Sequence, residues 1–205
     1  DLKGLYQVKN QKTVLNALDC VNGFSISQDN IANGLLNVIK NTGLHGRWEQ
    51  IQENPKVVID TAHNHEGLSE IAQQLANEKY RKLHIVWGMV SDKEAGEIMK
   101  LMPQSANWYL SEPSIPRKMA LADLEEIARS LKLSYTSHEN VKTALMAARK
   151  HASQDDFIYV GGFFPMTMSP VVSFWYFTVT QRPSSFCCLT GAQVPASIIC
   201  EGRTS

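Results

Sequence analysis

Residues 57–67 read VVIDTAHNHEG, a short β-branched run followed by a polar turn. Three consecutive β-branched residues favour a buried strand. Apolar residues then recur at the spacing of one helix face, at Leu68, Ile71, Ala72 and Leu75. The stretch therefore predicts a strand that passes through a turn directly into an amphipathic helix.

The same alternation continues toward the C-terminus. Further apolar runs occupy residues 83–87, 108–110, 133–135 and 157–160. Helical patterns lie between them over residues 91–102, 121–131 and 137–148, the last with Ser137 as its expected N-cap. Five strands separated by four helices require right-handed crossovers. The sequence therefore predicts an α/β fold, a doubly wound and largely parallel sheet with helices on both faces.

Composition divides the chain into three parts. The α/β domain is expected over residues 46–162. Residues 1–45 predict two helices, 13–21 and 27–39, which look like the end of a preceding domain. Residues 163–205 contain only three charged residues, Arg182, Glu201 and Arg203, and no sustained periodicity. We expect an atypical tail there, either disordered or translated from a shifted reading frame.

The charge balance limits the classes of partner. The chain has 205 residues, and 20 Lys plus Arg cancel 20 Asp plus Glu. This balance argues against a basic nucleic-acid-binding protein, and no apolar run approaches the ~18 residues needed to cross a bilayer. The four cysteines lack paired spacing, which favours a reducing compartment. We expect a cytoplasmic monomer without nucleic-acid or membrane partners.

The turn after the first strand carries the candidate binding residues. Ligands of open parallel sheets collect beyond the carboxyl ends of the strands, where Asp60 stands. Its carboxylate suits a ribose hydroxyl, and the following helix N-terminus suits phosphate. Arg47 could supply a bidentate guanidinium to the same phosphates. Two structural alternatives stay open: Asp60 and Asn64 as caps of the turn and helix, and Arg47 as a solvated residue beside a packed Trp48.

A metal site is a further alternative, because four potential ligands fall within seven positions: Asp60, His63, His65 and Glu66. His84 lies within a strand pattern, and we expect a hydrogen-bonded core or edge residue there rather than a ligand. The chain has no G-x-x-x-x-G-K-[ST], G-x-G-x-x-G or G-x-S-x-G motif. It therefore shows neither a glycine-rich phosphate loop nor a serine nucleophile of its own.

Several stretches taken together resemble one family. Gly46-Arg47-Trp48, residues 58–64 (VIDTAHN) and residues 86–93 (VWGMVSDK) resemble, in order and spacing, the glutamate-ligase domain of folylpolyglutamate synthase and dihydrofolate synthase. These enzymes belong to the Mur ligase superfamily. Residues 4–10 (GLYQVKN) look like the end of their central ATPase domain. The resemblance covers about residues 1–162 and does not extend into the tail.

The resemblance implies an ATP-dependent ligase that adds L-glutamate to folate or dihydropteroate through an acyl phosphate, with Mg²⁺ balancing the charge. It also implies four site residues: Asn10 at the adenine, Arg47 at the ATP phosphates, Asp60 at the ribose and His63 in the same pocket. The family's P-loop and Mg²⁺ ligands lie on an N-terminal domain outside this sequence, so the isolated fragment is not expected to turn over. A noncatalytic nucleotide-binding module and another Mur-type amino-acid ligase remain the alternatives.

Overall fold

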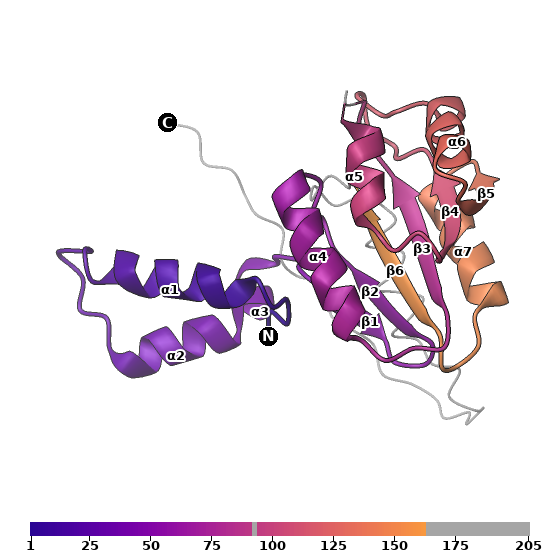
Figure 1. Cartoon of the computed structure of the whole chain (residues 1–205). Coiled ribbons are helices and arrows are strands. Elements are labelled where there is room, and N and C mark those ends of the chain that lie inside the picture. Colours follow the sequence, from indigo (N-terminus) through magenta and orange to yellow (C-terminus); the bar gives the residue numbers. More distant parts are fainter. Residues whose placement is uncertain (92–93, 163–205) are drawn as a thin grey trace, which may run out of the picture.

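A six-stranded sheet forms the centre of the computed structural model, which describes residues 1–91 and 94–162. The strand order is β1-β2-β6-β3-β4-β5 (Figure 1). The strands span Glu49–Gln52 (β1), Lys56–Ile59 (β2), Leu83–Gly88 (β3), Asn107–Ser111 (β4), Ser134–His138 (β5) and Phe157–Gly162 (β6). All neighbouring pairs from β2 to β5 in this order are parallel, and β1 is antiparallel to β2. The five predicted parallel strands are confirmed.

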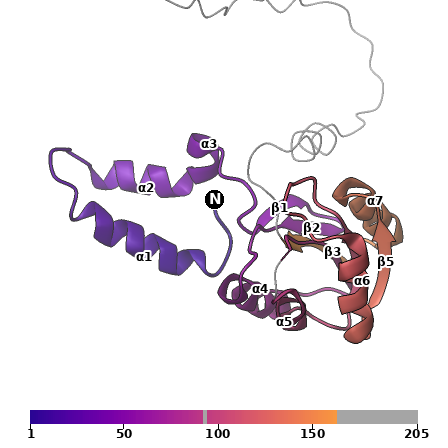
Figure 2. The same ribbon diagram turned by 90° about the horizontal axis from the view of Figure 1, so that it is seen from above.

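Helices cover both faces of the sheet, as predicted (Figure 2). α4 (His65–Asn77), α5 (Ala95–Leu101) and α6 (Leu121–Ser130) connect strands that progress in one direction, so right-handed crossovers place them on one face. α7 (Val141–His151) returns from β5 to β6 in the middle of the sheet and lies on the opposite face. Each face has its own buried apolar core, and the larger one lies beneath α4, α5 and α6.

The edge strand β1 is absent from the predicted pattern. Its sequence, Glu49-Gln50-Ile51-Gln52, contains one apolar residue among four. A polar edge strand avoids pairing with other chains, and its few covered positions leave little hydrophobic periodicity to detect. The sheet is therefore mixed, with one antiparallel strand beside five parallel ones.

Three predicted helix starts are wrong. α1 (Gln7–Leu18) begins at Gln7 and not at residue 13, and the starts of α7 and α5 also differ. Asn140 caps α7, because its Oδ1 accepts from Thr143 N at 3.0 Å while Thr143 Oγ1 accepts from Asn140 N at 3.3 Å. This reciprocal pair satisfies two donors, and Ser137 lies in β5 instead. α5 begins at Ala95, later than predicted, and residues 92–93 lie outside the described part.

Residues 1–45 form three helices instead of the two predicted: α1 (Gln7–Leu18), α2 (Gln28–Leu36) and α3 (Val38–Thr42). Ser27 caps α2 as predicted, with its Oγ accepting from Asn30 N at 3.1 Å. The helix stops at Asn37, whose φ of −125° departs from helical geometry. α1 and α2 run beside each other as an arm that projects from the sheet (Figures 1 and 2).

The base of this arm is fastened to α4. Leu5 N donates to Gln74 Oε1 at 2.8 Å, and Gln74 Nε2 donates to Lys3 O at 3.4 Å. Lys9 forms an ion pair with Glu70. These contacts hold the residues that precede α1, and its first turn, against α4.

The predicted boundary near residue 46 falls in the connection between α3 and β1. The predicted tail, residues 163–205, lies outside the described part of the chain. Across residues 1–91 and 94–162, no helix combines the length and apolar content that crossing a bilayer requires.

Candidate nucleotide site

A pocket of about 550 Å³ lies at the carboxyl end of β2. Its walls come from three segments: the start of α1, the connection before β1 and the turn from β2 into α4. Three of the four predicted site residues, Asn10, Arg47 and Asp60, line this pocket. The strand-end location predicted for the site is therefore where the described residues form a cavity.

Asp60 is fully buried at the base of the pocket. Its Oδ2 accepts from Trp48 N at 2.6 Å and from the Tyr6 hydroxyl at 2.7 Å, and its Oδ1 accepts from Ala62 N at 2.7 Å. Burial raises the pKa of Asp60, while these three donors and the charge of Arg47 oppose the rise. A carboxylate accepts about four hydrogen bonds, so most of its capacity is already used within the protein.

The backbone on both sides of Arg47 adopts the left-handed region. Gly46 has a φ of +72°, and Trp48 has a φ of +52°, which is uncommon for a bulky residue. This turn aims Trp48 N at Asp60, and the buried indole packs against Phe157 with ring centroids 6.1 Å apart. Trp48 is packed, as one alternative expected, and the same packing fixes the backbone that presents Arg47 to the pocket.

The N-terminus of α4 forms another wall. Asn64 is its N-cap, with Oδ1 accepting from Gly67 N at 2.9 Å, as the capping alternative predicted. The helix end carries partial positive charge, but Glu66 and Glu70 also line the pocket. A phosphate group would therefore bind best at the Arg47 guanidinium, because the two carboxylates repel it.

Asn10 lies on the arm, one helical turn after Tyr6. Its Nδ2 donates to Gln7 Oε1 at 3.0 Å, and both amide side chains line the pocket. The amide pair offers donors and acceptors at the end of the pocket formed by α1, which suits the edge of a base.

His63 is exposed and is absent from the pocket lining. Its Nδ1 donates to Thr61 O at 3.1 Å. Within the part of the chain that the structure describes, no three His, Cys, Asp or Glu side chains are grouped to hold a metal ion. The proposed ligand set of Asp60, His63, His65 and Glu66 therefore does not come together, and the metal alternative is wrong for this turn.

Tyr6 lines the pocket but was not predicted as a site residue. Its hydroxyl reaches Asp60 across 54 positions of sequence. Neither the strand pattern nor a helix face encodes this contact, because it depends on how the arm meets α4. The available signal was the position of Tyr6 within residues 4–10, four residues before Asn10.

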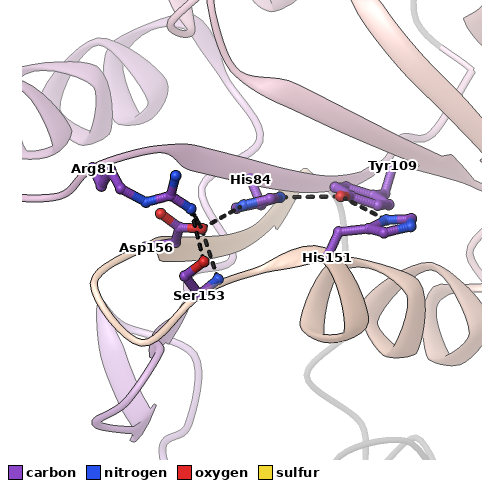
Figure 3. Close-up of polar contacts among 6 residues, drawn as sticks. All are labelled: Arg81, His84, Tyr109, His151, Ser153 and Asp156. Carbon is purple, nitrogen blue, oxygen red and sulfur yellow. Dashed lines mark hydrogen bonds and ion pairs between the residues drawn. The ribbon is translucent and has the colours of Figure 1, made fainter.

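A second polar cluster lies near the amino ends of the strands (Figure 3). His84 is 2% exposed; its Nε2 lies 3.4 Å from Asp156 Oδ2, and its Nδ1 lies 3.0 Å from the Tyr109 hydroxyl. That hydroxyl lies 3.3 Å from His151 Nδ1. His84 is therefore a hydrogen-bonded core residue, as predicted. A cavity of about 270 Å³, lined in part by Lys82, borders the cluster.

Two proteins serve as examples of the relatives whose sequences are similar to this chain. The "Probable bifunctional folylpolyglutamate synthase/dihydropteroate synthase" of Haloferax volcanii is 30% identical over 162 residues, which cover 78% of this chain and 19% of that protein. The "Dihydrofolate synthase/folylpolyglutamate synthase" of Escherichia coli K12 is 30% identical over 157 residues, covering 76% of this chain and 35% of the relative. The chain thus spans well under half the length of either relative.

The fold has a solved counterpart. Escherichia coli FolC in complex with ADP, without folate substrate, matches with a TM-score of 0.69 and 25% sequence identity. The match covers 84% of this chain and 40% of FolC. The match extends beyond the α/β domain, because residues 46–162 alone make up less than 84% of the chain.

The family comparison agrees with the fold. Residues 46–164 match the family model described as "Mur ligase, glutamate ligase domain". These residues make up more than half of the 205-residue chain. The match begins at Gly46, immediately before Arg47, and includes the whole sheet. This match agrees with the largely parallel sheet and its strand-end pocket, and it shows that the chain belongs to the Mur ligase family and carries its glutamate ligase domain.

Proposed function

We propose that this chain is part of an ATP-dependent ligase that adds L-glutamate to folate or dihydropteroate through an acyl-phosphate intermediate. The observation that carries the proposal is the convergence of Asn10, Arg47 and Asp60 on one pocket at the carboxyl end of β2. Its volume of about 550 Å³ suits a nucleotide. The sequence relatives are named for these synthase activities.

The pocket offers groups that fit both parts of ATP. Arg47, from the connection before β1, supplies a cation, and the Asn10 and Gln7 amides line the pocket from α1. We place the phosphates at Arg47 and the adenine at Asn10, because a guanidinium binds phosphate through paired hydrogen bonds while amides recognise base edges. His63 remains a candidate for a contact outside the pocket wall.

The acyl-transfer chemistry requires groups beyond the described residues. A solved bifunctional folylpolyglutamate synthase/dihydrofolate synthase with a TM-score of 0.62 has Mn, AMPPNP and L-glutamate bound. The described residues of this chain contain no grouped metal ligands, and its sequence has no P-loop. We propose that the Mg²⁺ ligands and the P-loop belong to another domain of the same ligase.

The domain arrangement follows from this proposal. Residues 46–162 would be the glutamate-ligase domain, and residues 1–45 the end of a central ATPase domain. The arm exposes large apolar side chains that a packed domain would cover: Val8, Val14, Leu15, Phe24 and Leu36. Residues 163–205 keep the prediction of an atypical tail. The monomeric state, the cytoplasmic localisation and the lack of nucleic-acid partners likewise stay predictions.

A chimeric enzyme tests the proposed function. Residues 1–162 would replace the corresponding segment of the Escherichia coli synthase, and glutamate-dependent ADP release would be measured with dihydropteroate or folate. We expect activity, and a loss of about tenfold or more in kcat/KM for Arg47→Ala, because a charge-assisted phosphate contact is removed. Arg129→Ala, on the exposed face of α6, is the matched control and should be neutral. A folded chimera that binds ADP without ligating would instead support a noncatalytic binding module.

A further inference from the structure

Asp60 and Tyr6, which are hydrogen-bonded to each other and line the pocket, differ in solvent exposure. Asp60 has no exposed surface, whereas Tyr6 is partly exposed and lines the cavity. Trp48 N and Ala62 N already occupy two of the positions on the carboxylate, and the Tyr6 hydroxyl occupies a third. Of these two lining residues, only Tyr6 has exposed surface that a molecule in the pocket could touch, and its hydroxyl is hydrogen-bonded to the buried carboxylate.

The hydroxyl proton of Tyr6 forms a hydrogen bond to Asp60. The hydroxyl donates to Asp60 Oδ2 at 2.7 Å. Burial, the charge of Asp60 and this hydrogen bond raise the pKa of Tyr6 well above its ordinary value, against smaller effects of Arg47 and Gln7. The phenol therefore stays protonated. With its one proton directed at Asp60, Tyr6 can act toward the pocket only as a hydrogen-bond acceptor.

The position of Tyr6 indicates which part of a nucleotide it faces. Asn10 follows Tyr6 by one turn of α1, and Arg47 is close enough for its charge to lower the pKa of both Tyr6 and Asp60. Tyr6 thus neighbours both the base end and the phosphate end of the pocket. In a nucleotide the sugar joins base to phosphates, and its hydroxyls are hydrogen-bond donors.

We propose that Tyr6 accepts a hydrogen bond from a sugar hydroxyl of the bound nucleotide, and that Asp60 is a positioning residue which orients the Tyr6 hydroxyl. The proposal rests on the proposed function, because it places a nucleotide in this pocket. It changes the role predicted for Asp60: the carboxylate acts on the ribose through Tyr6. No movement of the arm is needed for this contact.

Calorimetric titration of the 205-residue chain with ADP and with 2′,3′-dideoxy-ADP tests the proposal. Tyr6→Phe removes the acceptor and keeps the ring, so we expect ADP to bind roughly three- to tenfold more weakly, the value of one hydrogen bond. Binding of the dideoxy nucleotide should be unchanged, because it lacks the hydroxyls. Tyr80→Phe is the matched control, since Tyr80 is also partly buried, packs against Phe157 and lies outside the pocket lining. It should alter neither affinity.

The outcomes separate this proposal from the proposed function. An unchanged ADP affinity in Tyr6→Phe, with weakened binding in Arg47→Ala, would overturn the role of Tyr6 alone. An equal loss for both nucleotides would also overturn it, because that pattern indicates a structural role. The ratio of the two affinities is unaffected by partial unfolding of the variant. Failure of the unmodified chain to bind ADP, or binding indifferent to Arg47→Ala, would contradict the nucleotide pocket itself.

Discussion

Gly46 sets the direction from which Arg47 approaches the pocket. Its φ of +72° is accessible to glycine at little cost, and a Cβ built there would lie 2.8 Å from Thr61 Cγ2. Gly46 O also accepts from Thr61 N at 2.9 Å, which joins the connection before β1 to the turn after β2. One residue without a side chain therefore permits both the left-handed turn and the close approach of these two segments.

Gly46→Ala should destabilise the protein by roughly 2–3 kcal/mol, because left-handed strain and the clash with Thr61 add. Gly43→Ala provides the control: its φ is +67°, but a Cβ there would meet nothing within 4 Å. We expect about 1 kcal/mol from strain alone for Gly43→Ala. Urea unfolding measures both values. Equal losses in the two variants would show that the contact with Thr61 is unimportant.

Elements with strong hydrophobic patterns could be predicted from the sequence, and elements defined by single polar contacts could not. β2, β3 and β6 are apolar runs because helices cover both of their faces. β1 is polar, and the start of α7 depends on Asn140 rather than on the equally plausible Ser137. Likewise Asp60 and Arg47 could be placed from local sequence, whereas the contact from Tyr6 depends on the docking of the arm.

The cap of α7 gives a direct test at this scale. Asn140→Ala removes the side chain that satisfies Thr143 N, so we expect a loss of about 1 kcal/mol in the free energy of unfolding. Ser137→Ala, three residues earlier in β5, should change it by less than about 0.5 kcal/mol. Denaturant titration of both variants is the measurement. No loss of stability in Asn140→Ala would contradict the cap, whereas a loss in Ser137→Ala would report the hydrogen bond from its Oγ to Glu125 Oε1.

The cluster around His84 should make stability depend on pH. Burial lowers the pKa of His84 below 6.5, although Asp156 opposes this, so the unfolded chain binds a proton more readily than the folded one. The free energy of unfolding should therefore fall as the pH drops through about 6.5. His138, whose pKa is also lowered by burial and by His151, adds to the effect.

Unfolding of the protein and of His84→Gln at several values between about pH 7.5 and pH 5.5 measures this dependence. The variant should show a shallower slope, whatever its absolute stability, because the titrating group is gone. Parallel slopes would mean that His84 is not the source. Asp156 does not contribute to the slope between these pH values, because its pKa is lowered below its ordinary acidic value and it stays ionised over this range.

At the scale of the whole molecule, the pocket is shared between the arm and the α/β domain, and both buried apolar clusters of the described residues belong to the α/β domain. Both buried clusters lie within residues 48–160, whereas the arm contributes mainly contacts at its base. Asn10 and Tyr6 come from the arm, and Arg47 and Asp60 come from the glutamate-ligase part. The pocket is therefore complete only when the arm is fastened to α4.

Deletion of residues 1–45 should leave a cooperatively folding α/β domain and abolish most ADP affinity. The sheet and its helices keep their buried cores, but Asp60 loses the Tyr6 donor and the pocket loses a wall. Circular dichroism with thermal unfolding measures the fold, and calorimetry measures binding. Undiminished affinity in the folded deletion variant would remove the arm from the site.

An ADP titration of the ¹⁵N-labelled chain followed by NMR tests the location of the nucleotide most directly. The amides of Asn10, Arg47, Ala62 and Gly67 should shift together and saturate with one ADP per chain, because these residues surround the pocket at the carboxyl end of β2. Shifts confined to the cavity near His84 and Tyr109, at the opposite end of the sheet, would contradict this location.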